Sequence, residues 1–441
     1  MLMQLPRLLQ AYRHARRLRT QGFAHREALL AHQARGWARF ERQVLDRSRY
    51  FRPWRGLPLE RWPLMDKPQM MRQFDNMNTA GLKLAEVLSC AQAAEASRDF
   101  RPLLRGFGVG LSSGTSGGRG VFVVSPAERA QWAGTMLGTM LPEGLFAHER
   151  VALLLRADNA LYRTVRTPWL QFRFFDLMAA WAAQLEALQA WQPSIIVAPA
   201  QVLRALALAV RAGRLTLSPK LVISAAEVLE PQDRVLLQQV FAQVGEVYQA
   251  TEGFLGATCA HGTLHLNEAH LIVEPQWLDE QRFVPVITDF TRSTQPIVRY
   301  RLDDVLQVRR TPCPCGSPLR AIERIEGRCD DMLMLPGTQG KPLMVFADTL
   351  ARALAQALPL EADYQLEQLD ARTLRLSLAP ADPLLLRRCQ EHLQRLLRIQ
   401  GVQVSMLAWA EAQPIMAADF ARKRRRIRRM PSAPDSLPRA A

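Results

Sequence analysis

The sequence predicts an α/β protein with a large N-terminal domain of mostly parallel strands covered by helices, followed by a small α+β domain. Two observations lead to this fold class. From about residue 100, short β-rich runs alternate with helical stretches, as in a parallel sheet covered on both faces. Beyond about residue 330, the order of helices and strands is that of a separate small domain. A chain of 441 residues with 48% hydrophobic residues can form two or three such domains.

The first 60 residues are expected to be helical, because apolar and aromatic side chains recur three and four positions apart between arginines. They are typical of a cap and carry no pattern that indicates a site.

The central region is expected to contain the main sheet. Such sheets bind ligands where loops leave the carboxyl ends of the strands. The expected strands are 121–124, 151–155, 195–197, 221–224 and 244–248, and the expected helices between them include 126–141 and 201–212.

The last part is expected to begin with a turn at 336–338 and to form a small α+β domain. Its final segment after residue 430 is rich in Pro, Ser and Ala, which predicts a disordered tail. The expected elements are a helix at 346–357, strands at 364–369 and 373–378, a helix at 383–398 and a strand at 402–408.

The formal net charge of +16 would attract polyanions such as nucleic acid or an anionic membrane. Most of this charge is arginine, scattered among Ala and Leu in helix-like segments. We therefore expect no nucleic-acid partner, whereas a ligand that bears a polyphosphate is compatible with this composition.

No apolar run approaches the roughly 18 residues that a membrane-spanning helix needs, and the N-terminus lacks the apolar core of a secretory signal. We therefore expect a cytoplasmic protein with no transmembrane segment. Residues 1–19 are apolar and basic at helical spacing, so peripheral contact with a membrane surface stays open as an alternative.

The strongest local signal is a Ser/Thr/Gly loop directly before the strand expected at 121–124. Glycines let the backbone approach a ligand with its amides turned inward, and hydroxyls add donors, which suits a polyphosphate. The loop is not a P-loop, because the lysine of that motif is absent. The alternative is a flexible linker. The candidate phosphate-binding residues are Ser112, Ser113, Gly114, Thr115, Ser116 and Gly117.

A second segment follows the strand expected at 244–248. Tyr248 offers a flat face for an adenine ring, and Thr251 with Glu252 could hold a magnesium ion between phosphates. The alternative is an ordinary strand end with a solvated glutamate.

A third constellation consists of Asp304 and, some two dozen residues later, Arg328. A carboxylate that accepts ribose hydroxyls is a common way to hold a nucleotide, and a nearby arginine can serve ribose or phosphate. The alternative is a pair of solvated charged turns.

In order and spacing, these segments together resemble the adenylate-forming superfamily, most closely its phenylacetate–CoA ligase branch. The resemblance implies that the Ser/Thr/Gly loop closes over the phosphates of ATP. It also implies that Tyr248 stacks on adenine, that Thr251 contacts a phosphate and that Glu252 binds Mg²⁺.

Further positions follow from the same resemblance. Ala226 and Glu227 match the adenine-edge segment of the family, in which Ala225 replaces a glycine. Asp304 matches the ribose-binding aspartate and Arg328 the arginine of the hinge motif, which makes Asp330 the expected hinge residue.

The resemblance also implies a catalytic lysine near the end of the small domain. Lys423 is the candidate, in a basic segment where the family commonly has a glycine before the lysine and this chain has Arg422. The alternative is a basic tail that binds nucleic acid or anionic lipid.

The six cysteines are too sparse for a disulfide framework, so we expect reduced thiols. Thiolates and imidazole are the ligands that zinc prefers in a closed structural site. Cys259, His265, Cys313 and Cys315 form a candidate set, and some phenylacetate–CoA ligase relatives look similar here. His261 and His270 compete with His265 as the fourth ligand, and unligated surface thiols are the alternative to any zinc site.

The expected domains are a helical cap region of the large domain at 1–99, its ATP- and acid-binding core at 100–329, a mobile lid domain at 330–430 and a disordered tail at 431–441. The implied reaction is the ATP- and Mg²⁺-dependent activation of a carboxylic acid as its acyl-adenylate. Transfer to a thiol would follow, either coenzyme A or the phosphopantetheine of an acyl carrier protein.

The acid is expected to be an aryl or fatty acid, because the region between about residues 133 and 175 mixes apolar and aromatic side chains. The aromatic residues that indicate this pocket are Trp132, Tyr162, Trp169, Phe172, Phe174 and Phe175.

Two other functions stay open at this point. One is transfer of AMP to a hydroxyl, as in the related synthetases that adenylylate a deazaflavin coenzyme, which would use the same ATP-binding motifs. The other is a non-catalytic binder of nucleic acid or a membrane surface driven by the basic charge.

Overall fold

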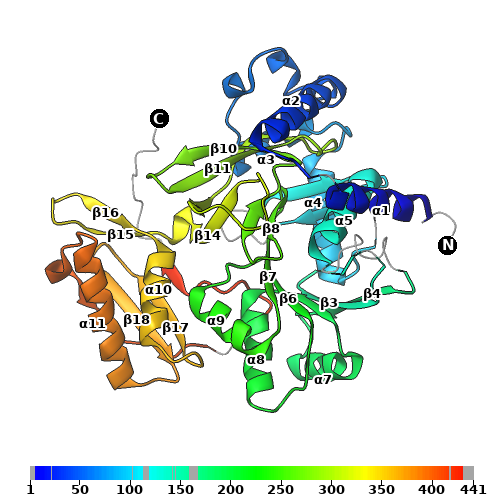
Figure 1. Ribbon diagram of the computed structural model, residues 1–441. Coiled ribbons are helices and arrows are strands. Elements are labelled where there is room, and N and C mark those ends of the chain that lie inside the picture. The colour runs from blue at the N-terminus through cyan, green and yellow to red at the C-terminus, as the bar shows by residue number, and fades with distance from the viewer. Residues whose placement is uncertain are drawn as a thin grey trace.

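The structure, a computed structural model, describes residues 5–20, 22–101, 103–112, 119–141, 143–144, 146–157, 167–416 and 419–430 (Figure 1). A large N-terminal part is built on one extended sheet, and a smaller α+β part lies beside it (Figure 1). Within the described ranges, every helix is too short or too polar to span a bilayer.

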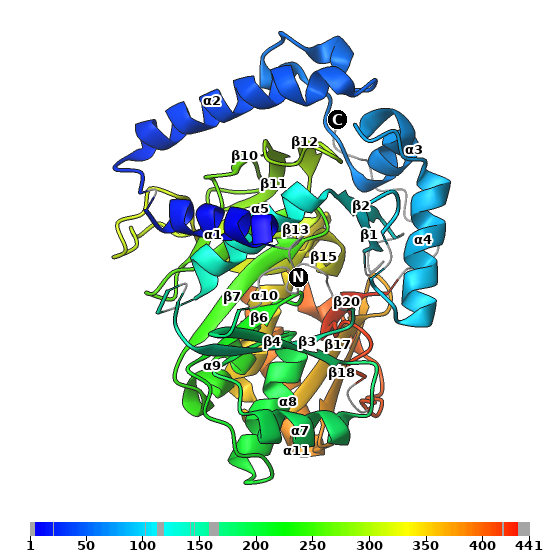
Figure 2. The ribbon, with the colours of Figure 1, turned by 90° about the vertical axis from the view of Figure 1, so that its right-hand side faces the viewer.

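The N-terminal region is helical, as expected, with α1 (Leu5–Thr20), α2 (Arg26–Gln43), α3 (Lys67–Met77) and α4 (Leu84–Ser97). Helix α1 packs against α5 (Pro126–Met140) (Figure 2). The two backbones approach closely, because a Cβ atom at Gly134 would lie only 2.3 Å from the carbonyl oxygen of Ala11. Ala11 and Ala15 are fully buried at this crossing. Small residues on both helices therefore fix α1 onto the sheet.

The large sheet has 12 strands and is mixed. Strands β4 (Leu170–Asp176), β3 (Glu149–Leu155), β5 (Ile195–Ala198), β6 (Leu221–Ala225) and β7 (Val244–Ala250) are parallel neighbours in that order. From β7 onward the pairing is antiparallel. The antiparallel strands are β8 (Gly253–Thr258), β9 (Leu264–Leu266), β10 (Leu271–Trp277), β11 (Arg282–Asp289), β12 (Ile297–Arg301), β13 (Asp304–Val308) and β14 (Ala321–Arg328).

Helices cover both faces of the parallel half. Helices α7 (Trp181–Trp191), α8 (Ala200–Arg211) and α9 (Pro231–Val240) bury one face, whereas α5 and α1 bury the other. Both faces are buried because successive side chains of a strand point to opposite faces of the sheet. In β6, Val222 packs against α7, α8 and α9, and Ile223 packs on the side of α5 and α1. The prediction of parallel strands covered on both faces is confirmed for this half.

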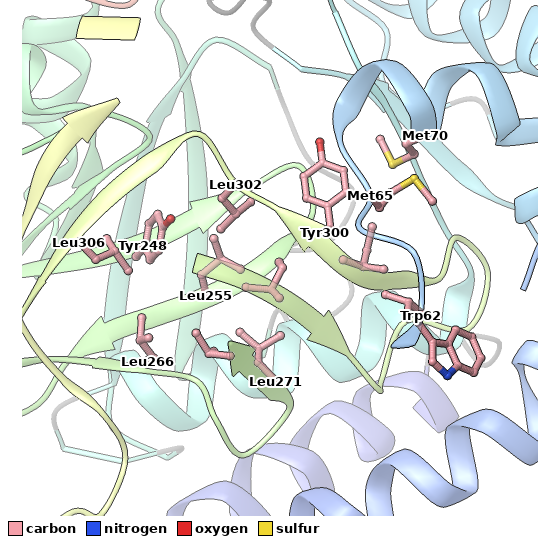
Figure 3. Packing of buried hydrophobic residues seen from close by; sticks show 14 of the residues in the cluster. Trp62, Met65, Met70, Tyr248, Leu255, Leu266, Leu271, Tyr300, Leu302 and Leu306 are labelled. Atoms are coloured by element: carbon pink, nitrogen blue, oxygen red, sulfur yellow. The ribbon is translucent and has the colours of Figure 1, made fainter. Parts of the chain in front are cut away.

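The segment before α3 shares a core with the antiparallel half of the sheet. Trp62, Met65 and Met70 belong to one buried cluster with Tyr248 and Tyr300 (Figure 3). Met65 also bridges to the strand that carries Tyr300. This shared core holds the N-terminal region against the antiparallel half of the sheet and β7, which carries Tyr248.

The small part begins with the hairpin β15 (Leu333–Pro336) and β16 (Pro342–Val345), followed by α10 (Ala347–Ala357). A separate sheet then has the order β19-β18-β17-β20, packed against α10 and α11 (Pro383–Ile399). Its strands are β17 (Asp363–Gln368), β18 (Thr373–Ala379), β19 (Ala408–Trp409) and β20 (Ile427–Arg429).

The prediction of a strand at 402–408 is wrong. Most of this stretch is a turn with a short 3-10 helix, Val404–Met406, and only its last residue enters β19. Val402 is buried and forms a bridge with Gly337, so tertiary contact with the β15–β16 hairpin fixes this segment. The sheet is completed by β20, where Ile427 pairs in parallel with Leu366. The last residues, 431–441, for which a disordered tail is expected, lie outside the described residues.

Candidate nucleotide-binding site

The site is built around Tyr248 at the end of β7. Its hydroxyl donates a hydrogen bond to Oδ2 of Asp304 at 2.7 Å, which joins β7 to the start of β13. Burial, together with the carboxylates of Asp304 and Glu252, raises the pKa of Tyr248 well above its ordinary value. Tyr248 therefore stays a protonated donor, and the sequence-predicted residues Asp304 and Glu252 lie close to it.

Glu252 lies in the turn between β7 and β8 and is buried, next to the half-buried Thr251. Glu252 lies beside Tyr300, and burial together with this carboxylate raises the pKa of the tyrosine. The backbone carbonyl of Glu252 accepts from Nη1 of Arg292 at 3.1 Å. A carboxylate such as that of Glu252 offers the oxygen ligands that Mg²⁺ favours.

Asp304 and Arg328 face each other in the register of β13 and β14. Nη2 of Arg328 lies 3.5 Å from Oδ2 of Asp303. Burial raises the pKa of Asp303, against the opposing effect of Arg328 and Lys67. Asp330 follows in the short 3-10 helix Cys329–Asp331, where the chain leaves β14 for the small part. This position is compatible with the hinge role expected for Asp330.

The turn after β6 carries Ala226 and Glu227. Ala226 has a φ of 67°, a left-handed conformation that costs a non-glycine residue about 1–2 kcal/mol. The Glu227 carboxylate is 5% exposed and accepts from Nη2 of Arg156 at 2.7 Å. Nε2 of Gln201 donates to the same oxygen at 2.9 Å. Glu227 is thus already engaged by two side chains of the large part.

Lys423 reaches this region from the C-terminal segment. Burial lowers its pKa and Arg328 and Arg156 lower it further, whereas Glu227 and Asp304 raise it. The lysine therefore lies among the groups that the sequence analysis assigned to ATP. Within the described ranges it forms no salt bridge.

Of the Ser/Thr/Gly loop, only Ser112 is described, and Ser113, Gly114, Thr115, Ser116 and Gly117 lie outside the described residues. Ser112 pairs with Gly120, whose backbone nitrogen donates to Oγ of Ser112 at 2.7 Å. Ser112 and Gly120 follow and precede the antiparallel strands β1 (Gly108–Leu111) and β2 (Val121–Val124), respectively. A Cβ atom at Gly120 would lie 3.7 Å from Cδ of Lys67, so that lysine lies beside Gly120.

The four candidate zinc ligands come together. Their ligand atoms all lie within 4.8 Å of one another, in the group Cys259, His265, Cys313 and Cys315. Sγ of Cys259 lies 3.6 Å from Sγ of Cys313. Two sulfurs bound tetrahedrally to one zinc at ~2.3 Å would stand about 3.8 Å apart, so the spacing fits.

His265 and not His261 or His270 joins this group. Nδ1 of His265 lies 3.1 Å from the carbonyl oxygen of Leu319, which leaves Nε2, 3.4 Å from Sγ of Cys315, to face the cluster. A histidine whose second nitrogen contacts a carbonyl in this way is the usual arrangement around a metal. His261 is exposed, whereas His270 is half-buried and lies beside Asn267.

An apolar cavity lies between α5 and the parallel strands. Its walls are almost free of polar atoms. Ile223 lines it, and Ala225, two residues further along the same face of β6, leads to the turn with Ala226. Other lining residues are Met136, Leu137, Met140, Val151 and Val197.

The aromatic pocket predicted from the sequence is largely not found there. Phe172 lines the cavity, but Phe175 lies on the opposite face of the sheet against Trp191. Trp132 borders a neighbouring, more polar hollow. Tyr162 lies outside the described residues. The walls are mainly aliphatic because Val, Leu and Ile on alternate strand positions point to this face.

The sequence analysis did not predict that Arg156, Gln201 and Tyr300 shape the site. It also did not predict that Lys67 lies beside Gly120. Arg156 and Gln201 stand at the carboxyl end of β3 and the start of α8, where a ligand site of a parallel sheet is expected. Their place directly after an expected strand and at the start of an expected helix could have identified them as candidate site residues.

No protein-family model matches the chain, and comparison with curated proteins gives no matching sequence. Solved structures match in fold. The chain is similar to 2-hydroxyisobutyryl-CoA ligase in the postadenylation state in complex with R3-HIB-AMP. The TM-score is 0.65 at 17% identity, over 92% of this chain and 89% of the other. With the open conformation of that ligase the TM-score is 0.52 at 18% identity, over 92% and 91% of the two chains.

Two further enzymes match more distantly. The anthranilate CoA ligase AuaEII in complex with anthranoyl-AMP has a TM-score of 0.50 at 13% identity, over 72% of this chain and 66% of its own. The amide bond synthetase McbA from Marinactinospora thermotolerans has 0.51 at 14% identity, over 72% and 67%. The mixed sheet with its small α+β part therefore has the fold of the adenylate-forming ligases.

Proposed function

We propose that the chain activates a carboxylic acid with ATP as its acyl-adenylate and then transfers the acyl group to a thiol. The observation that carries this proposal is that Asp304 and Glu252 lie beside Tyr248, and that Lys423 is half-buried in the neighbourhood of Asp304. A carboxylate such as Glu252 can bind a metal ion, a carboxylate such as Asp304 can accept ribose hydroxyls, and a lysine such as Lys423 can bind a phosphate. The likeness in fold to acyl-CoA ligases supports the same reaction.

In the proposed reaction, an oxygen of the substrate carboxylate attacks the α-phosphorus of ATP. The bond between this phosphorus and the bridging oxygen breaks, and pyrophosphate leaves. Negative charge builds on the phosphoryl oxygens, so catalysis depends on positioning and on cations. Lys423 supplies one positive charge, and Glu252 is the residue that would hold Mg²⁺, whose charge would offset that of the departing phosphates.

Other residues would hold the nucleotide and the hinge. Asp304 is proposed to accept ribose hydroxyls, with Arg328 beside it, and Ser112 begins the loop proposed to cover the phosphates. Thr251 is proposed as a phosphate contact. Asp330 is proposed as the hinge about which the small part turns, so that the thiol of coenzyme A or of a carrier protein can reach the adenylate.

The acid is proposed to be apolar, a fatty acid or a simple aryl acid as in the phenylacetate–CoA ligase branch. The support is the cavity under α5, whose walls offer almost no hydrogen-bond partner. A polar substituent buried there would lose its hydrogen bonds to water, at a cost of about 1–3 kcal/mol.

Pyrophosphate release measured with a panel of acids tests the function. We expect release to depend on the acid, with kcat/KM for octanoate about 10- to 100-fold above that for octanedioate, which ends in a second carboxylate. Phenylacetate and 4-hydroxyphenylacetate form a matched aryl pair. A rate that no acid raises above the acid-free background would contradict the proposal.

We also propose that Cys259, His265, Cys313 and Cys315 bind a structural zinc ion. The ion would tie the β8–β9 hairpin to the connection between β13 and β14. All four positions would be filled by protein ligands, so its contribution would be to stability and not to chemistry.

Metal removal tests the zinc site. Chelation is expected to lower the free energy of unfolding by about 4 kcal/mol relative to protein with zinc at ~1,000 times its Kd. His265→Ala should lower the zinc content per chain, measured by mass spectrometry of the metal, and His261→Ala should not. A purified chain without zinc, whose unfolding does not respond to added zinc, would exclude the site.

A further inference from the structure

The backbone just before Lys423 is held by side chains of the large part. The carbonyl oxygen of Arg422 accepts from Nη2 of Arg156 at 2.6 Å and from Nε2 of Gln201 at 2.6 Å. Nε of Arg156 also donates to the carbonyl oxygen of Phe420 at 2.9 Å. Three hydrogen bonds thus fix the segment that presents the lysine, and all of them use its backbone.

The two donors are held in place by Glu227. Its Oε1 accepts from both Arg156 and Gln201, at 2.7 and 2.9 Å, and its Oε2 accepts from the backbone nitrogen of Gln201 at 3.3 Å. Glu227 is 5% exposed and Arg156 20% exposed, so this charge pair is shielded from solvent. Because both donors bind Glu227, they are oriented toward Arg422 by a residue of the large part.

An apolar contact anchors the same segment. The ring of Phe420 packs on Trp181 with their centroids 4.5 Å apart, at the edge of the core formed by α7, α8 and α9. The side chain of Arg422, in contrast, is 88% exposed and contacts Asp419. The segment is therefore gripped by its backbone and by Phe420, while the side chain next to the lysine points away.

We infer that Arg156, Gln201 and Glu227 form a clamp that positions Lys423 for the adenylation step. This inference rests on the proposed function and adds positioning residues to it. In this account Glu227 holds the C-terminal segment instead of reading the edge of adenine. The clamp exists only while residues 420–423 lie on the large part, so it acts in adenylation and is released when the small part turns away.

The test separates the two half-reactions. Arg156→Leu removes two side-chain contacts to the segment and Gln201→Leu removes one, and each should slow single-turnover pyrophosphate release by about 10- to 100-fold at saturating ATP and acid. Thioester formation from a synthetic acyl-adenylate and coenzyme A should stay within twofold. Arg156→Lys should recover part of the adenylation rate, and the KM for ATP should change little.

Arg310→Leu is the matched control, because it removes an exposed arginine that pairs with the exposed Glu280 on the surface. Thermal unfolding of every variant shows whether it is folded, and Glu227→Gln provides a third variant if one of the others is not. Equal slowing of both half-reactions, or adenylation within twofold of normal in Arg156→Leu and Gln201→Leu, would overturn the clamp. A chain that releases no pyrophosphate before substitution would overturn the proposed function itself.

Discussion

Replacing Lys423 with alanine is expected to lower acid-dependent pyrophosphate release by about 10²–10³-fold, the usual effect of removing one group that stabilises charge in a transition state. Lys423 lies near Glu227, Asp304, Arg328 and Arg156, and burial lowers its pKa. Water therefore screens the ammonium group only partly, so the group interacts with a developing phosphoryl charge more strongly than it would in bulk water. The measurement is single-turnover pyrophosphate release at saturating ATP and acid.

Two controls separate this effect from a general loss of positive charge. Lys341→Ala removes an exposed lysine of the β15–β16 turn and should leave the rate unchanged. ATP binding by Lys423→Ala, measured by calorimetry, should be weakened only slightly, since the lysine acts mainly after binding. An unchanged rate of pyrophosphate release in Lys423→Ala would remove this residue from the mechanism.

Replacing Asp233 with alanine is expected to destabilise the protein by about 3–5 kcal/mol, because it removes the buried carboxylate that neutralises two buried guanidinium groups. Oδ1 of Asp233 accepts from Arg204 at 2.8 Å and from Arg426 at 2.9 Å, and Oδ2 accepts from Arg426 at 2.8 Å. All three residues are at most 4% exposed. The measurement is the free energy of unfolding from a denaturant titration.

This network joins the two parts of the chain. Arg426 precedes β20, whereas Asp233 and Arg204 lie on α9 and α8. Arg204 also donates to the carbonyl oxygens of Leu360 and Ala362 in the small part, at 2.7 and 2.9 Å. Burial raises the pKa of Asp233, but Arg426 and Arg204 outweigh it and the net shift is downward. Asp233 therefore stays ionised, and its stabilising effect is lost only when the pH falls through this lowered pKa.

Glu361→Ala is the matched control for Asp233→Ala. Glu361 pairs with Arg211 across the same two parts, but the side chains are 54% and 40% exposed. Exposed pairs of this kind contribute at most about 1 kcal/mol. If the two variants were equally stable, the buried network would not hold the small part in place.

The strands of the parallel half could be predicted because short Val-, Ile- and Leu-rich runs between helices indicate strands buried on both faces. Residues 221–225 are an example, since Val222 and Ile223 are both buried, on opposite faces. The strand order of the antiparallel half could not be predicted, because strands far apart in the sequence pair with each other there, as β9 does with β14. Strand β20 was missed because three residues, two of them arginines, carry no periodicity.

Much of the candidate site could be found from the sequence, because Tyr248 and Glu252 or Asp304 and Arg328 lie within short motifs at recognisable spacing. The clamp and the network around Asp233 could not. Arg156 and Arg426 look like any other arginine of a chain rich in arginine, and only the fold brings them to Arg422 and Asp233. The choice of His265 over His261 likewise depended on the register of β9 between β8 and β14.

Acid-dependent exchange of labelled pyrophosphate into ATP is the most direct test of the proposed acyl-adenylate. This exchange runs the first half-reaction backward and needs no thiol, so it tests adenylate formation independently of the acceptor. We predict exchange with an apolar acid and Mg²⁺, suppression of exchange in Lys423→Ala, and a hydroxamate when hydroxylamine is added. Exchange that ignores the acid, or adenylyl transfer without any hydroxamate, would contradict the activation of a carboxylate.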